Sequence, residues 1–170
     1  MTEARGGPPR DGVVLARTLL WRGVEYPYVE VWLEDVQLGD RRWAQHRVLV
    51  GGGVPGCVVV PVRDDEILLA LSWRPAVRVW AWELPRGFGR SVGEGADDEA
   101  PEETGARELL EETGYRVATS RLLGWIWPDS GLLGNTVAVV RAQVAAGSPR
   151  PVTDREVSQT KWVPVAQLPE

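Results

Sequence analysis

Residues 107–115 of this 170-residue chain read Arg-Glu-Leu-Leu-Glu-Glu-Thr-Gly-Tyr. On a helix that turns about 100° per residue, Glu108 and Glu112 lie about 40° apart, and Glu111 lies about 60° to the other side of Glu108. Three carboxylates then share one narrow stripe, where each like-charged pair costs about 4 kcal/mol at close range. A divalent cation with oxygen ligands is the natural compensation for such a cluster. The stretch therefore predicts a helix with a metal-binding face.

The flanking residues predict where this helix begins and ends. Pro101 suits the first helical turn, where its missing N–H costs nothing. Gly114 suits the left-handed position that ends a helix. Gly105, inside the helix, costs about 1 kcal/mol relative to alanine. We therefore expect tertiary packing to support the helix.

Composition restricts the class of protein. A chain of this length with 44% hydrophobic and 25% charged residues is typical of one soluble globular domain. The net charge of -5 argues against a nucleic-acid partner, which requires a basic surface. No apolar run approaches the length needed to span a bilayer, so no membrane partner is expected. Because Cys57 is the single cysteine, no internal disulfide forms, and we expect a cytoplasmic location.

The sequence around the helix predicts strands. Residues 1–12 are expected to form a disordered tail, and residues 13–53 a small N-terminal antiparallel layer that ends in a glycine hinge. The strand-like runs of that layer are Val13–Trp21, Tyr28–Gln37 and Trp43–Val50. Residues 54–170 carry six more runs: Cys57–Val62, Glu66–Trp73, Val79–Leu84, Leu122–Trp127, Asn135–Val144 and Glu156–Val165. The prediction is an α+β protein, an α/β/α sandwich with a mixed sheet and a central helix.

The residues from Gly93 to Tyr115 resemble the Nudix hydrolase signature, G-x5-E-x7-R-E-U-x-E-E-x-G-U, in which U is apolar. All its fixed places are filled, by Gly93, Glu99, Arg107, Glu108, Leu109, Glu111, Glu112, Gly114 and Tyr115. The segment Trp82–Gly87 is similar to the family's lead-in strand and loop, and Trp162–Pro164 to its late strand. The resemblance covers about residues 55–168 and implies the Nudix fold.

One departure concerns the loop before the helix. In the family the signature's first glycine usually follows the Leu-Pro-x lead-in directly, which here indicates Gly87 rather than Gly93. Anchored on Gly87, the loop is six residues longer than the signature allows. We favour an insertion within residues 89–100, and Glu94 and Glu99 are then alternatives for one acidic position.

The resemblance implies the composition of the site. Mg²⁺ or Mn²⁺ would be bound around a diphosphate by Glu108, Glu111, Glu112 and the backbone carbonyl of Arg86 or Gly87. Catalytic roles would fall to Glu111, to Arg107, which is placed to pair with Glu111 at i,i+4, and to Glu156, our candidate for the general base. The ordinary alternative for Glu156 is a loop carboxylate without a role in catalysis.

Two segments resemble the ADP-ribose pyrophosphatase branch of the family: Ser72–Pro75 and Trp82–Pro85. That likeness implies substrate-binding roles for Arg74, Glu83 and Arg86, a homodimer built with the N-terminal layer, and hydrolysis of ADP-ribose to AMP and ribose 5-phosphate. The alternative for Arg74 is an ordinary surface ion pair. Five tryptophans are candidates for stacking a purine, although sheet or core positions are the simpler interpretation: Trp73, Trp80, Trp82, Trp125 and Trp127.

Three alternative functions stay open. A nucleotide sugar or a dinucleoside polyphosphate is the nearest alternative substrate. A module that senses a nucleotide without cleaving it is a second alternative, but a pure binding protein need not retain every glutamate of the signature. A tailoring hydrolase of a biosynthetic pathway is the third.

Overall fold

The computed structural model describes residues 12–25, 28–90, 99–152 and 156–168. The expected N-terminal tail, except for Gly12, lies outside the described residues. Gly93 and Glu94 of the loop also lie outside them. The chain divides into two compact units, Met1–Gly53 with Asp129–Gly134, and Val54–Pro128 with Asn135–Glu170. Within the described ranges, no helix has the length and apolar character that crossing a membrane requires.

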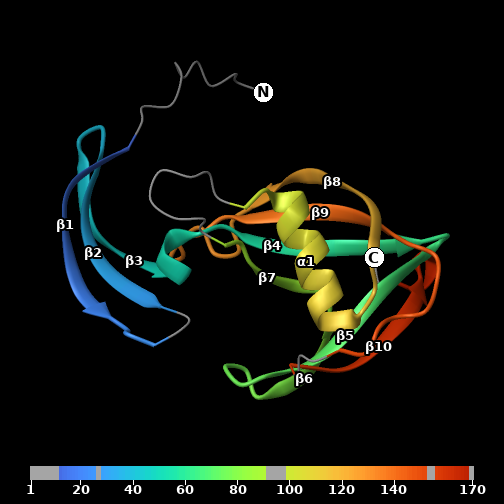
Figure 1. The fold of residues 1–170 in the computed structure, drawn as a ribbon. Helices are drawn as coiled ribbons and strands as arrows, with labels where there is room; N and C mark the ends of the chain where they lie inside the picture. Colours follow the sequence, from blue (N-terminus) through green and yellow to red (C-terminus); the bar gives the residue numbers. More distant parts are fainter. Residues whose placement is uncertain (1–11, 26–27, 91–98, 153–155, 169–170) are drawn as a thin grey trace, which may run out of the picture. The chain divides into compact units, whose positions relative to one another are not determined.

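The first unit is a three-stranded antiparallel sheet in the order β1-β2-β3 (Figure 1). Its strands are β1 (Val13–Arg22), β2 (Val29–Leu38) and β3 (Arg41–Val50), followed by the short 3-10 turn η1 (Gly51–Gly53). Gly39 turns the chain between β2 and β3 with a φ of 63°, a conformation that glycine adopts without strain.

The segment Asp129–Gly134 belongs to this first unit although it lies between two strands of the second. The N–H of Val48 on β3 donates to the carbonyl of Leu132 at 2.9 Å, and the N–H of Gly134 donates to the carbonyl of Val48 at 2.8 Å. A Cβ atom on Gly134 would lie 2.3 Å from Nε of Arg47, so a side chain here would require the Arg47 side chain to move. The segment therefore occupies the free edge of β3.

The second unit contains a seven-stranded mixed sheet. Its strands are β4 (Gly56–Arg63), β5 (Glu66–Arg74), β6 (Val79–Glu83), β7 (Arg86–Phe88), β8 (Val117–Ile126), β9 (Val137–Val144) and β10 (Val157–Pro164), followed by the 3-10 turn η2 (Val165–Gln167). The order is β10-β5-β4-β9-β8, with β6 beside β5 and β7 beside β4. The β4–β9 pair is parallel and the other pairs are antiparallel.

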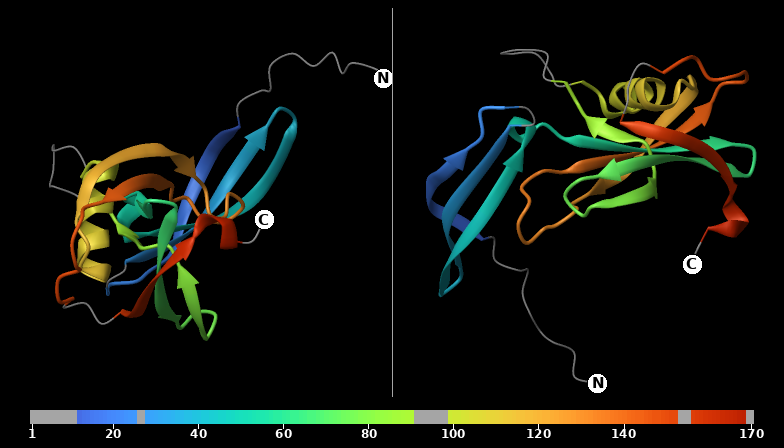
Figure 2. Two further views of the ribbon diagram at one scale, coloured as in Figure 1. Left: turned by 90° about the vertical axis from the view of Figure 1, so that its right-hand side faces the viewer. Right: turned by 90° about the horizontal axis from the view of Figure 1, so that it is seen from below.

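Helix α1 (Pro101–Thr113) packs against one face of this larger sheet (Figures 1 and 2). Pro101 lies in its first turn, and Gly114 ends it with a φ of 74° and an N–H donated to the carbonyl of Leu110 at 3.0 Å, as predicted. A Cβ atom on Gly105 would lie 3.3 Å from a methyl group of Val140 and 3.4 Å from Sγ of Cys57. The close approach of helix and sheet therefore explains a glycine that costs helical stability.

The core lies between α1 and the sheet. It is formed by Cys57, Val59, Leu68, Leu109, Ala138, Val140, Ala142 and Val144, with Tyr115, Val117, Leu122 and Trp162 packed around it. The predicted α+β class with a mixed sheet and a central helix is confirmed. A three-layer α/β/α sandwich has helices on both faces of the sheet. Among the described residues, the structure has one α-helix, α1.

Two strands differ from the sequence prediction. Strand β8 begins at Val117 rather than Leu122, because its first half pairs with β9 without carrying a strong apolar pattern. Strand β7 was expected to be a loop, and its three residues are held in extended form by pairing with Gly56–Val58 of β4. This short pairing delivers the lead-in loop directly beneath α1.

Candidate active site

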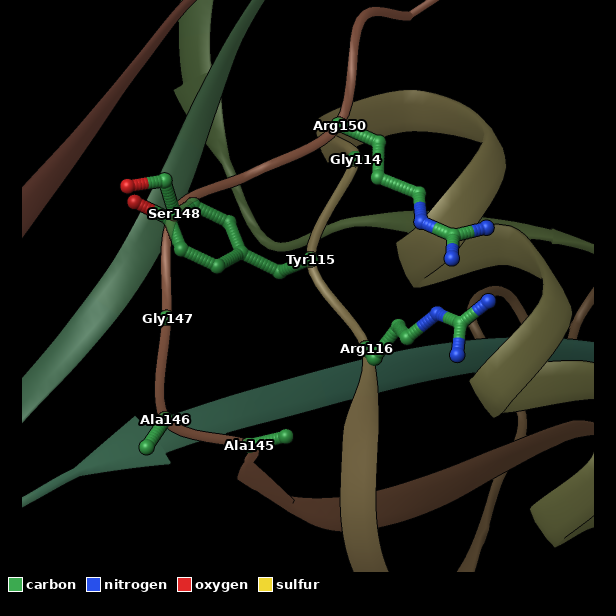
Figure 3. Close-up of a pocket in the computed structure, with 8 residues that line it drawn as sticks. All are labelled: Gly114, Tyr115, Arg116, Ala145, Ala146, Gly147, Ser148 and Arg150. Carbon is green, nitrogen blue, oxygen red and sulfur yellow. The ribbon is translucent and has the colours of Figure 1, made fainter.

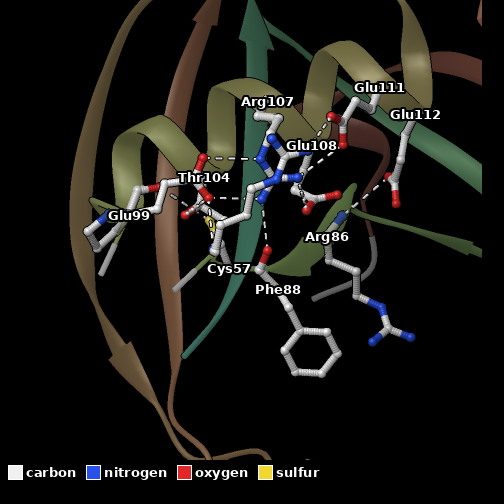
Figure 4. A network of polar contacts seen from close by, with 11 residues as sticks. Cys57, Arg86, Phe88, Glu99, Thr104, Arg107, Glu108, Glu111 and Glu112 are labelled. Atoms are coloured by element: carbon white, nitrogen blue, oxygen red, sulfur yellow. Dashed lines mark hydrogen bonds and ion pairs between the residues drawn. The ribbon is translucent and has the colours of Figure 1, made fainter. Parts of the chain in front are cut away.

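Arg107 is the centre of a polar network on α1 (Figure 4). Its Nη1 donates to Glu108 at 2.6 Å and to Glu111 at 3.0 Å, which confirms the pairing expected from the i,i+4 spacing. Its Nε and Nη2 donate to the two carboxylate oxygens of Glu99 at 3.1 and 2.9 Å, and Nη2 also donates to the carbonyl of Phe88 at 2.8 Å. One guanidinium therefore fixes three carboxylates and the end of β7.

Glu99, one of the two alternatives for the acidic position, contacts Arg107. Besides Arg107, its Oε2 accepts a hydrogen bond from the hydroxyl of Thr104 at 3.0 Å and one from the backbone N–H of Arg90 at 3.1 Å. The hydrogen bonds from Arg107 lower the pKa of Glu99 below its ordinary value, despite partial burial. Glu99 is therefore a charged anchor for Arg107, while Glu94 lies outside the described residues.

Glu108 lies directly against the lead-in glycine. A Cβ atom on Gly87 would fall 2.1 Å from the carboxyl carbon of Glu108, so a side chain at this position would displace the carboxylate. Burial raises the pKa of Glu108, and the hydrogen bond from Arg107 opposes that rise. A half-buried carboxylate of this kind is stabilised by a nearby cation.

Glu112 lies one helical turn further along and is only 6% exposed. Its Oε2 accepts a hydrogen bond from the backbone N–H of Arg86 at 3.3 Å. Glu108 and Glu112 therefore contact consecutive residues of β7, Gly87 and Arg86, so both carboxylates lie beside this short segment.

The three residues expected to bind substrate form one chain of ion pairs. Glu83 accepts from Nε of Arg74 at 2.6 Å with one oxygen and from Nε of Arg86 at 3.0 Å with the other. The ordinary interpretation of Arg74 as an ion-pair partner is thus realised in this conformation. Arg86 connects the expected substrate-binding residues to the carboxylates of α1, because its side chain contacts Glu83 and its backbone contacts Glu112.

The donor set fits a hard divalent cation. Glu108 and Glu112 offer carboxylate oxygens beside the Arg86–Gly87 peptide, and oxygen ligands are what Mg²⁺ and Mn²⁺ prefer. Among the described residues, no group of three or more His, Cys, Asp or Glu side chains converges closely enough to form a ready-made metal centre. Three of the four carboxylates here, Glu99, Glu108 and Glu111, are ion-paired with Arg107.

Glu156 lies directly before β10, outside the Arg107 network described above. It is exposed and precedes β10, whose first residue, Val157, pairs with Ser72 of β5 two residues from Arg74. Its neighbourhood is therefore the Arg74 end of β5, and its role as a base stays a prediction.

The five candidate tryptophans are sheet-face or loop residues rather than core residues. Their exposed fractions range from 38% for Trp82 to 61% for Trp127. Trp73 and Trp80 pack against each other with ring centroids 5.8 Å apart. Nζ of Lys161 lies 4.1 Å from the ring centroid of Trp82. Trp125 lines a cavity of about 230 Å³ that borders Glu99 and Thr104.

A smaller cavity of about 120 Å³ lies at the C-terminal end of α1 (Figure 3). The side chains of Arg116 and Arg150 extend beside the helix there, and the N–H of Arg150 donates to the carbonyl of Gly114 at 2.9 Å. Positive charge at a helix C-terminus is stabilising in its own right. We therefore assign this cavity a structural role.

Sequence reasoning missed two members of the Arg107 network. Thr104 holds Glu99, and Arg90 holds Glu111 through its Nη2 at 3.2 Å. Neither falls on a fixed place of the signature, and the contacts that give them a role are visible only in the structure.

Comparisons with known proteins agree with this site. The NUDIX domain profile matches residues 53–170. The chain is 30% identical to a CMP-5'-(N-acetyl-N-hydroxy-3-aminopropyl)phosphonate hydrolase of Streptomyces rubellomurinus, over 84% of this chain and 66% of that protein. It is 27% identical to the ADP-ribose pyrophosphatase of Saccharomyces cerevisiae over 92% of this chain and 71% of that protein. The corresponding values for the ADP-sugar pyrophosphatase of Mus musculus are 26%, 88% and 70%.

A crystal structure of an ADP compounds hydrolase superposes with a TM-score of 0.72 over 95% of this chain and 83% of that one, at 17% sequence identity, which shows the shared fold. The chain belongs to the Nudix family, and the expectation of an enzyme of the pyrophosphohydrolase class is confirmed. Members of this family generally require divalent metal ions and act on nucleoside diphosphate derivatives. The chain spans slightly less than two thirds of the Streptomyces relative's length.

Proposed function

We propose that this protein hydrolyses a nucleoside diphosphate linked to another group, with ADP-ribose as the first candidate and AMP and ribose 5-phosphate as products. The observation that supports this proposal is the position of Glu108 and Glu112 around the Arg86–Gly87 peptide, with Arg107 fixing Glu108 and Glu111. The yeast and mouse relatives, named for ADP-ribose and ADP-sugar pyrophosphatase activity, favour this substrate class.

Glu108, Glu112 and the carbonyl of Arg86 or Gly87 would hold Mg²⁺ or Mn²⁺, with Glu111 beside them. The cation supplies neutralisation of the diphosphate charge and a lower pKa for an activated water. Arg107 keeps the carboxylates in position, since its own charge is secured by Glu99.

The reaction needs a water oxygen to attack one phosphorus atom while the bond from that phosphorus to the bridging oxygen breaks. A carboxylate accepts the proton of the water, and the bridging oxygen leaves with the other phosphate. Glu111 is 43% exposed at its side chain and lies on the accessible side of the network, so it is one candidate for the base. Glu156 is the second candidate, from the end of β10.

Substrate binding would fall to Arg74, Glu83 and Arg86. Their ion pairs hold two guanidinium groups on Glu83, and the backbone of Arg86 contacts Glu112 of the carboxylate helix. Guanidinium groups bind phosphate oxygens with two parallel hydrogen bonds.

A CMP-linked substrate is the second candidate, because the Streptomyces relative at 30% identity is named for hydrolysis of a CMP-linked phosphonate. That name also favours the alternative of a tailoring hydrolase. Both candidates contain a nucleoside monophosphate joined to a second phosphorus group, so the same carboxylates would serve either one.

The test is a substrate panel with Mg²⁺ or Mn²⁺: ADP-ribose, an ADP-sugar, a CMP-linked compound and a dinucleoside polyphosphate, with product analysis by chromatography. Glu112→Gln should lower kcat by about 100-fold or more, as expected for loss of a directly participating group. Glu103→Gln, an exposed glutamate in the first turn of the same helix, should leave kcat unchanged. Absence of turnover for every compound, with tight nucleotide binding, would instead indicate the sensing module.

We also propose that the protein is a homodimer in the cytoplasm. All ten residues of β1 are exposed, among them Val13, Leu15, Leu20 and Trp21, and the apolar core consists of residues of the second unit. An exposed apolar edge strand of this length usually has a partner. Sedimentation equilibrium should give twice the 18.7 kDa chain mass, and a monomer with unchanged activity would contradict the dimer.

A further inference from the structure

Two arginines share Glu111, but they are held very differently. Arg107 donates five hydrogen bonds and its side chain is 16% exposed. Arg90 reaches Glu111 Oε1 with Nη2 at 3.2 Å, and its side chain is 63% exposed. Exposed ion pairs of this kind contribute little to stability, so the Arg90 guanidinium can leave Glu111 at small cost.

The backbone of Arg90, in contrast, is fixed. Its N–H donates to the carboxylate of Glu99 at 3.1 Å, and its carbonyl accepts the N–H of Glu99 at 3.0 Å. Glu99 is itself secured by Arg107 and Thr104. The Cα atom of Arg90 is therefore anchored beside the carboxylates while its side chain is the part able to move.

The charges of the network favour a second use for this guanidinium. Glu99, Glu108, Glu111 and Glu112 bring four carboxylates, against the two guanidinium groups of Arg90 and Arg107. A cation bound among the carboxylates weakens the attraction of Glu111 for Arg90, and a diphosphate then presents new negative charge at the same place. Arginine matches phosphate oxygens with two parallel donors.

We propose that Arg90 is a phosphate ligand of the substrate: its guanidinium exchanges the carboxylate of Glu111 for a phosphoryl oxygen of the diphosphate. This inference rests on the proposed function, since it places an additional cationic contact beside the carboxylates that would hold the metal. No covalent step is involved. Arg90 lies outside the fixed places of the signature, so this contact would be particular to chains with an arginine at the neck of this loop.

Calorimetric titration of ADP in the presence of Mg²⁺ tests the exchange directly. Arg90→Gln should weaken ADP binding about tenfold, which corresponds to about 1.4 kcal/mol, and Arg90→Lys should restore part of the loss. In turnover of the preferred substrate, Arg90→Gln should raise KM by a similar factor with kcat changed less than about threefold. Arg121→Gln, an exposed arginine on β8, is the matched control and should change neither quantity.

A titration with Mn²⁺ alone, followed by electron paramagnetic resonance, separates this role from a purely structural one. Removal of Arg90 should leave Mn²⁺ affinity unchanged or raise it, because a competing cation is lost. Weaker Mn²⁺ binding with unchanged ADP affinity would mean that Arg90 only positions Glu111, and would overturn the proposal. The proposal would also be overturned if the wild type and Arg90→Gln bound ADP with equal affinity, or if the wild type bound no ADP. Wild-type ADP binding without turnover of any panel compound would refute the proposed hydrolase but not this contact.

Discussion

Arg86 donates its backbone N–H to Glu112 at 3.3 Å, and this hydrogen bond ties β7 to the last turn of α1. The same residue reaches Glu83 with its guanidinium at 3.0 Å, and Glu83 in turn binds Arg74. The residues expected to bind metal and those expected to bind substrate are therefore joined at Arg86. A substitution among the substrate-binding residues should therefore alter metal binding, and a substitution among the metal-binding residues should alter substrate binding.

Glu83→Gln tests this connection. The amide removes the charge that holds Arg74 and Arg86, so both guanidinium groups lose their fixed orientation. We expect KM for the nucleotide substrate to rise by about threefold to tenfold, in the range of the net contribution of a typical hydrogen bond, with a smaller change in kcat. Steady-state kinetics measure it, and Glu66→Gln, which breaks the looser 3.9 Å pair with Arg63, is the control. Equal KM values in both variants would show that Glu83 only supports the surface.

Gly87→Ala tests the contact between β7 and Glu108. The added Cβ atom would fall 2.1 Å from the carboxyl carbon of Glu108, so that carboxylate must move away. We expect a loss of about 1–3 kcal/mol in unfolding free energy, as for other overpacked sites, and weaker Mn²⁺ binding. Chemical denaturation and Mn²⁺ titration provide the readouts. Gly124→Ala on β8 has nothing within 4 Å of its Cβ position and should be neutral in both measurements.

Thr104→Val tests the support of Glu99. Thr104 is 2% exposed, and its hydroxyl donates to Glu99 at 3.0 Å. The variant keeps the volume but removes the donor, so the free energy of unfolding should fall by about 1 kcal/mol. Thr104→Ser retains the hydroxyl and should preserve the pKa of Glu99, measured by NMR titration. A serine variant with the same pKa change as the valine variant would exclude the hydroxyl as the cause.

The acid limb of stability should depend on Glu99. The hydrogen bonds from Arg107 hold its pKa below the ordinary value of 4.5, so the folded state binds this proton less tightly than the unfolded state does. The resulting stability is present above about pH 4.5 and is lost as the pH falls through the lowered folded pKa. Glu99→Gln should therefore be less stable than wild type at pH 7, and the difference in unfolding free energy should shrink as the pH falls through the lowered folded pKa of Glu99. Urea titrations across this range measure the difference; a constant gap would contradict the assignment, and Glu103→Gln serves as the exposed control.

Cys57 should be nearly inert in the folded protein. Burial, with the charge of Glu108, raises the pKa of the thiol from 9.0 to about 12. At pH 8 this leaves about 1,000-fold less thiolate than in the unfolded chain, and the thiolate is the reactive form. Iodoacetamide should label the protein rapidly in urea and very slowly without it, as followed by mass spectrometry. Similar rates in both conditions would mean that the thiol is accessible and ionised in the native state.

The order of residues from Pro101 to Gly114 was sufficient to predict the helix, its ends and the Arg107–Glu111 pair. These features depend on spacing along one helix, which the sequence contains directly. Apart from the first half of β8, the larger strands were also predicted to within a few residues from their apolar patterns. The assignments of metal, base and substrate residues remain predictions.

What the sequence did not contain are contacts between distant segments. The contact between Glu99 and Arg107 is one of these, and the count of loop residues allowed either Glu94 or Glu99 in the acidic position. Strand β7 is three residues long and exists through its pairing with β4. Arg90 has no sequence signal at all, since its importance comes from the carboxylate that it happens to face.

The segment Asp129–Gly134 bears on how such a protein is taken apart and recombined. Because it completes the edge of β3, a chain cut at Gly53 would leave Leu132 and Gly134 without their partners on Val48. Grafting the N-terminal sheet onto another hydrolase would then require the transfer of two separate segments, residues 1–53 and Asp129–Gly134. The N-terminal sheet is thus a structural unit built from two separate stretches of the chain, and truncation from the N-terminus is a poor way to isolate the catalytic part.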